Sequence, residues 1–169
     1  MFYFDPMYFV FALPPLLLVF WAQAKVRGAY SKYSQIRNMA NASGAQVARV
    51  LLQSRGLYDV AVERAPGELT DHYDPRTRTL RLSEGVYSTP SVAAMGIVAH
   101  EVGHADQHAT GYAPLKARSA LVPAVNLGST LGYLLFLAGF VIGASQLVWL
   151  GIGFFSLGVL FALVTLPVE

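Results

Sequence analysis

The residues best suited to chemistry lie at positions 100–104, where the chain reads His-Glu-Val-Gly-His. On an α-helix, residues four apart lie on the same face, so the imidazoles of His100 and His104 can bind one metal ion. In zinc hydrolases with this pattern, the intervening carboxylate accepts a proton from a water polarised by the ion, as that water attacks a carbonyl carbon. The spacing therefore predicts a zinc site with His100 and His104 as ligands and Glu101 as the catalytic base.

The helix that must carry this motif is predicted from the residues before it. Thr89 suits the N-cap and Pro90 the first helical position, and an almost unbroken apolar run follows over residues 92–99. A helix that is apolar on nearly all sides is buried, and titratable groups at its end are costly unless they bind something. A structural helix with an incidental histidine pair is the alternative, and this setting argues against it.

The composition places much of the chain outside water. Hydrophobic residues make up 54% of the 169 residues and charged residues only 13%, whereas a soluble domain has about 25% charged residues. The net charge is +2 and no block of Lys or Arg stands out, so nucleic acid is not an expected partner. Without Cys, the chain has neither disulfides nor thiolate zinc ligands.

Three apolar segments are long enough to cross a lipid bilayer. Residues 6–24 form the first predicted transmembrane span. A cleaved signal peptide is the alternative, but such peptides begin with positive charges and this N-terminus offers only Asp5. Residues 121–166 hold the other two spans, separated only by Ser145 and Gln146, which predicts a transmembrane helical hairpin.

Glycines at helical spacing recur along both spans of this hairpin. They are Gly128, Gly132, Gly139 and Gly143 in the first span, and Gly151 and Gly158 in the second. Stripes of small residues let membrane helices approach closely. The alternative is that glycine is simply common in membrane helices.

The basic residues predict which side of the membrane each segment faces. All twelve Lys and Arg residues lie between Lys25 and Arg118. Positive charges next to a span favour the cytoplasmic side. The charges after the first span, and Lys116 and Arg118 before the second, therefore both place residues 25–118 in the cytoplasm, as the catalytic domain of a multi-pass membrane protein.

This segment is predicted to be a small α+β, zincin-like domain. Ser43 and Gln46 form a capping box for an amphipathic helix over residues 44–55. Three strands are expected next, at residues 57–64, 69–73 and 79–83, the last two flanking a Pro-containing turn. The helix with the metal ligands follows. The edge of such a sheet can pair with an extended peptide substrate and hold it across the metal.

A catalytic zinc site needs a third protein ligand. His108 is eight residues after His100, which is roughly 12 Å along a straight helix and too far for both to bind one ion. His108 therefore fits better outside the ligand set, as do His72 and Asp106. Glu169 is the better candidate, because two crossings return the chain to the side of the motif. An interfacial charge beside a span is the alternative for Glu169.

Four segments, in order, resemble the YugP-like membrane neutral zinc metallopeptidases. They are LTDHYDPRTRTLRLS at 69–83, AAMGIVAHEVGHADQHA at 93–109, LVPAVNLGS at 121–129 and FALVTLPVE at 161–169. The resemblance implies Zn2+, a bacterial inner membrane, His100 and His104 as ligands, and Glu101 as base. A looser similarity to HtpX-type membrane peptidases supports Glu169 as the third ligand. Family members continue past this glutamate, so residues 167–169 are expected to begin a C-terminal segment that is truncated here.

The leading hypothesis is a gluzincin-like zinc metallopeptidase in the lipid bilayer that cuts peptides or membrane proteins at the cytoplasmic face. A site-2-type intramembrane protease is one alternative, but that class needs the motif helix to cross the membrane and an Asp in a later span, and neither late span contains one. A non-catalytic, metal-binding membrane scaffold is the other. No oligomeric state follows from the sequence.

Overall fold

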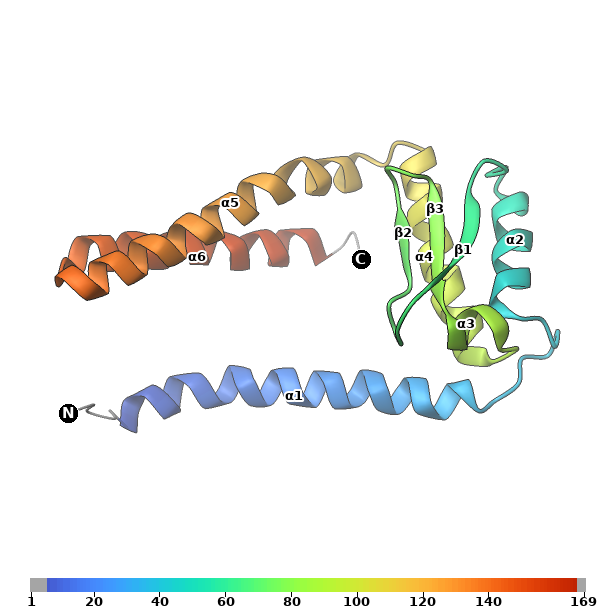
Figure 1. Cartoon of the computed structure of the whole chain (residues 1–169), viewed down its shortest axis with the longest axis horizontal. Coiled ribbons are helices and arrows are strands. Elements are labelled where there is room, and N and C mark those ends of the chain that lie inside the picture. The colour runs from blue at the N-terminus through green and yellow to red at the C-terminus, as the bar shows by residue number, and fades with distance from the viewer. Residues whose placement is uncertain (1–5, 167–169) are drawn as a thin grey trace. The chain divides into compact units, whose positions relative to one another are not determined.

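The computed structural model describes residues 6–166, which form mixed helix and sheet as predicted (Figure 1). The elements in chain order are α1 (Pro6–Ser34), α2 (Gly44–Ser54), β1 (Ala61–Ala65), β2 (His72–Asp74), β3 (Thr79–Ser83), α3 (Glu84–Ser88), α4 (Val92–Ala109), α5 (Ala113–Ile142) and α6 (Ser145–Thr165). The chain divides into two compact units, residues 1–106 and 107–169, so α4 begins in the first and ends in the second.

The sheet has β3 in its centre, with β1 on one side and β2 on the other. β2 pairs with β3 in antiparallel fashion, which confirms the predicted hairpin, although β2 is only three residues long. β1 lies parallel to β3. The strand predicted at residues 57–64 begins later, at Ala61, because the preceding residues form a turn whose apolar side chains face the core.

α2 begins and ends as its sequence predicts. The Ser43 N–H donates to the Gln46 side chain at 2.8 Å, and the Gln46 N–H donates to the Ser43 hydroxyl at 3.4 Å, which together form the capping box. Gly56 has a φ of +71° just after the helix end, and the next N–H, that of Leu57, donates to the carbonyl of Leu52 at 2.9 Å.

The hydrophobic core of the first unit lies between the sheet and helices α2, α3 and α4. Leu80 and Leu82 of β3 are fully buried, and Val86 of α3 and Val98 of α4 pack in the same cluster. Close packing also explains a glycine at the start of α2, since a Cβ at Gly44 would collide with the carbonyl of Val86.

α4 differs from its prediction in two ways. It begins at Val92, and the hydroxyl of Ser91, rather than Thr89, accepts from the Ala94 N–H at 3.1 Å as its cap. Only one face of the helix is buried, on residues spaced three or four apart: Ala94, Val98, Val102 and Ala105. Val92 and Met95 are about two-fifths exposed. Within the first unit, the expected burial on nearly all sides is therefore wrong, because that unit leaves one apolar face of α4 uncovered.

The end of α1 is fixed to the start of α4. Arg37 and Ser91 form an isolated antiparallel bridge. On either side of it, the Asn38 N–H donates to the carbonyl of Pro90 at 3.0 Å, and the Val92 N–H donates to that of Ile36 at 2.8 Å. α1 itself continues ten residues beyond the predicted span, to Ser34. Its crossing of a membrane stays a prediction.

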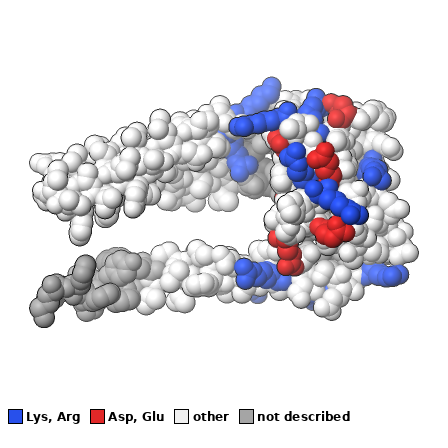
Figure 2. Space-filling model, viewed as in Figure 1, with Lys and Arg blue, Asp and Glu red and all other residues white. Residues whose placement is uncertain are grey.

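The second unit contains the predicted helical hairpin. Within residues 6–166, α5 and α6 are the two helices long and apolar enough to cross a membrane, and the visible faces of these helices are nearly bare of charge (Figure 2). The turn lies earlier than predicted: Gly143 takes a left-handed φ of +72° and Ser145 already begins α6.

Three of the predicted glycines bring the hairpin helices into backbone contact. A Cβ added at Gly132, Gly139 or Gly151 would lie 2.7–3.0 Å from a backbone atom of the opposite helix. Gly128 and Gly158 make ordinary side-chain contacts instead, and Gly143 serves the turn. The packing interpretation of the stripe is therefore confirmed in its central part.

Asp74, at the turn between β2 and β3, gives a pH-dependent prediction. The Arg76 N–H, the Arg81 guanidinium and the Thr77 hydroxyl bind its carboxylate and lower its pKa to about 2. Since the unfolded value is about 3.9, the carboxylate contributes stability above that pH and loses this contribution as the pH falls through about 2. Asp74→Asn should therefore lower the melting temperature at pH 6, with the difference shrinking toward pH 2. Circular dichroism melts at several pH values measure this.

Glu63→Gln is the matched control, because Glu63 also pairs with Arg81, but at 3.5 Å and without the turn hydrogen bonds. Its effect on the melting temperature should be smaller than that of Asp74→Asn. A melting-temperature difference for Asp74→Asn that stays constant from pH 6 to pH 2 would contradict this role of the carboxylate.

Candidate metal centre

His100 and His104 lie on the same face of α4, as their spacing predicts. Their Nε2 atoms are 3.2 Å apart and their rings meet edge to face at 79°. Two histidine nitrogens that bind one zinc ion at a tetrahedral angle, each at about 2.0–2.1 Å, are about 3.3–3.4 Å apart. The pair therefore fits two ligands of a tetrahedral zinc ion.

Glu101 is held beside this pair by the sheet. Its side chain is mostly buried, with 9% of the residue exposed, and its Oε2 accepts from the Tyr73 N–H at 3.0 Å. Burial raises the pKa of Glu101 above its ordinary value, while the neighbouring His100 and His104 and the Tyr73 N–H oppose this shift. A buried carboxylate fixed by a backbone N–H beside the histidine pair is placed where a general base for water would lie.

The other residues considered as possible metal ligands do not join His100 and His104 in the described structure. Among residues 6–166 no third His, Asp or Glu joins His100 and His104 in a group that could hold a metal. His72 is exposed and its Nδ1 lies 2.8 Å from the Thr70 carbonyl. Asp106 pairs with Arg55 at 3.6 Å. Glu169, the predicted third ligand, lies outside the described residues, and its role stays a prediction.

A cavity of about 360 Å³ opens beside the candidate base. Val26, Leu69, Asp71, Gly96, Ile97, His100 and Glu101 line it. The polar end is organised by β3, because the carboxylate of Asp71 accepts from the N–H and the hydroxyl of Ser83 at 2.8–3.1 Å. The cavity therefore has an apolar wall and a carboxylate-rich end next to the histidines.

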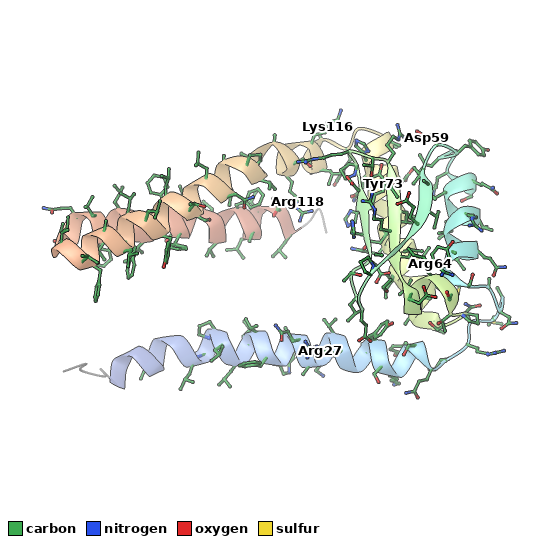
Figure 3. The ribbon with its side chains drawn as sticks, viewed as in Figure 1. Arg27, Asp59, Arg64, Tyr73, Lys116 and Arg118 are labelled. Carbon is green, nitrogen blue, oxygen red and sulfur yellow. The ribbon has the colours of Figure 1, made fainter. Side chains whose placement is uncertain are left out.

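The contribution of Tyr73 was not predicted from the sequence. Tyr73 is the central residue of β2, one of the two edge strands of the sheet, and is labelled in Figure 3. Residues of an antiparallel strand alternate in the edge to which their N–H and C=O point. The bond to Glu101 therefore indicates that the Tyr73 N–H faces away from β3. The sequence pointed to Tyr73 only through the period-two pattern that predicts its strand. That pattern does not indicate which edge of the strand is free.

The comparisons with known proteins identify the family. A family described as "putative neutral zinc metallopeptidase" matches residues 8–169. The chain is 48% identical over 164 residues to the "putative membrane protease YugP" of Bacillus subtilis (strain 168). The aligned segment covers 96% of this chain and 73% of that protein. No solved structure matches. The resemblance inferred from the motifs is thus confirmed, and the chain belongs to the family described as "putative neutral zinc metallopeptidase".

Proposed function

We propose that this protein is a membrane-bound zinc metallopeptidase that hydrolyses peptide bonds at the cytoplasmic face of a bacterial inner membrane. The observation that carries the proposal is the histidine pair, with Nε2 atoms 3.2 Å apart, beside a buried carboxylate held by an edge strand. Family membership supports zinc as the cofactor.

Each residue of the site has a separate task in this proposal. His100 and His104 hold the metal, together with Glu169 as the third ligand. Zinc, when bound, supplies Lewis-acid chemistry that acidifies a water and polarises a carbonyl group. Glu101 accepts the proton of the attacking water and delivers it to the leaving amine. The Tyr73 N–H fixes one carboxylate oxygen of Glu101, so that the other can face the water.

The edge of the sheet supports a peptide as the substrate. β2 is an edge strand, and its outer side reaches Glu101 at Tyr73. An extended chain that pairs with such an edge is held by main-chain hydrogen bonds, whatever its side chains. Because the Tyr73 N–H already donates to Glu101, such a peptide would pair with the other backbone groups of this edge and lie beside the histidine pair.

The membrane location rests on different observations. α5 and α6 are apolar enough to cross a bilayer, and the relative from Bacillus subtilis is named a membrane protease. Lys116 and Arg118 lie near the start of α5 (Figure 3), which favours the cytoplasm for that end. An intramembrane protease is less well supported, because α4 is not among the apolar spans of residues 6–166.

The proposal predicts a metal-dependent activity and a ligand set. Purified protein should hydrolyse a casein-derived peptide mixture, lose this activity on dialysis against a chelator, and regain it with one equivalent of Zn2+ per chain. Glu169→Ala should lose bound zinc, whereas His108→Ala should keep it, because the third ligand is the glutamate. Zinc per chain is measured by plasma mass spectrometry.

His108→Ala and Glu169→Ala are controls for each other. The ligand assignment would be wrong if His108→Ala lost zinc and Glu169→Ala kept it. The function itself would be wrong if the zinc-loaded wild-type protein hydrolysed no peptide.

A further inference from the structure

We propose that an apolar groove between α1 and α4 receives a large hydrophobic side chain of the substrate, and that the protein therefore selects peptides with such a residue next to the scissile bond. This inference rests on the proposed function, because it names the substrate class of the same site. Three observations carry it: the lining of the groove, its continuity with the candidate centre, and one glycine.

The groove has a volume of about 440 Å³ and is lined by apolar and aromatic residues from α1, α4 and the loop before β2. These include Val26, Tyr30 and Tyr33 of α1, Leu69 of the loop, and Val92 and Ile97 of α4. Among the residues that the structure describes, no charged side chain lines it. An apolar lining favours an apolar occupant, since each methylene group removed from water contributes to binding.

The groove continues into the cavity that contains His100 and Glu101. Val26, Leu69, Gly96 and Ile97 line both spaces. The occupant must therefore be apolar at one end and carry a hydrolysable polar group at the other. A peptide bond next to a large hydrophobic side chain meets both conditions.

Gly96 is the third observation. It lies in the second turn of α4, one turn before His100, inside the helix, where glycine is less stabilising than alanine. A Cβ added at Gly96 would meet no protein atom within 4 Å, in contrast to Gly44, where it would collide with Val86. Packing among the described residues of the first unit therefore does not require this glycine. A ligand that approaches the helix backbone closely would account for it.

The wall formed by α1 is fixed at one end of the groove. The bridge between Arg37 and Ser91 ties the segment just after α1 to the residue just before α4, and the side chain of Tyr30 packs against the core cluster. The residues of both helices that line the groove belong to the first compact unit. The width of the groove close to the Arg37–Ser91 bridge is therefore set by the fold.

The test uses peptides of one sequence that differ only at the residue next to the cleaved bond, which is Leu, Phe, Ala or Asp. For the zinc-loaded wild-type protein, kcat/KM for the Leu and Phe peptides should exceed that for the Ala peptide by about tenfold or more, with the Asp peptide lowest. Gly96→Val fills the groove and should bring the ratio of Leu to Ala down toward one. Cleavage is followed by mass spectrometry.

Gly28→Val is the matched control. Gly28 is also a helical glycine whose added Cβ would meet nothing within 4 Å, but it does not line the groove. Its Leu-to-Ala ratio should equal that of the wild type. Binding provides a readout besides hydrolysis: the Glu101→Gln variant should bind a fluorescent Leu peptide about tenfold more tightly than the Ala peptide.

The outcomes separate the two proposals. If the wild type cleaves none of the peptides and Glu101→Gln binds none, the proposed function fails. If peptides are cleaved but Gly96→Val keeps the wild-type Leu-to-Ala ratio, the groove is not a side-chain site and this inference is overturned. The same holds if Gly96→Val changes only the amount of co-purified phospholipid, since the groove would then hold an acyl chain.

Discussion

Replacing Glu101 by Gln should lower the rate of peptide hydrolysis by about 10²–10⁴-fold while leaving zinc bound, the range expected for loss of general acid–base catalysis. Glutamine has nearly the same shape, and its amide oxygen can still accept from the Tyr73 N–H, which now binds Oε2 at 3.0 Å. The variant loses only the ability to take a proton from water. Single-turnover peptide hydrolysis and zinc content, measured on the same preparation, check this.

Glu68→Gln is a suitable control, because it removes an exposed carboxylate from the same unit and should leave the rate unchanged. Retention of full activity in Glu101→Gln would exclude Glu101 as the base. Absence of hydrolysis in the wild type, with zinc bound in both proteins, would instead favour the metal-binding scaffold.

His104→Ala should abolish both zinc binding and hydrolysis. Loss of residues that only orient a ligand lowers metal affinity by about 10–100-fold, so loss of a direct ligand should exceed this range. The remaining His100 and one carboxylate cannot complete a catalytic zinc site, which uses three protein ligands. Competition titration with a fluorescent zinc chelator gives the affinity.

His72→Ala is the matched control, since it removes an exposed histidine whose ring contacts the Thr70 carbonyl and is not part of the His100–His104 pair. It should keep one zinc per chain. Zinc affinity in His104→Ala within about tenfold of the wild type would contradict the ligand assignment.

Local patterns in the sequence predicted the elements that depend on local interactions. The capping box at Ser43 places α2 correctly, because both of its hydrogen bonds span three residues. The predicted start of α4 was two residues too early, because Pro90 engages Asn38 across the bridge and leaves the cap to Ser91. α3 was not predicted, and its five residues give no periodicity to read.

The same distinction applies to the candidate centre. His100 and His104 could be predicted, because a helix alone brings them together. The bond from Tyr73 to Glu101 joins residues 28 positions apart, and the groove combines side chains from α1, the loop before β2 and α4. Such contacts depend on tertiary packing. The apolar run in α4 predicts burial, whereas part of it lines the groove.

In the α5–α6 hairpin, insertion into the bilayer and association of the two helices depend on different properties, and hydropathy measures only the first. In lipid, apolar side chains gain little by leaving the acyl chains, so the association of two helices depends on how closely their backbones approach. At Gly132 and Gly151 the backbones meet where a methyl group would intrude. An added methyl there would leave each helix as apolar as before and still open the hairpin. Insertion into the bilayer and assembly within it therefore depend on different residues, and one can fail while the other succeeds.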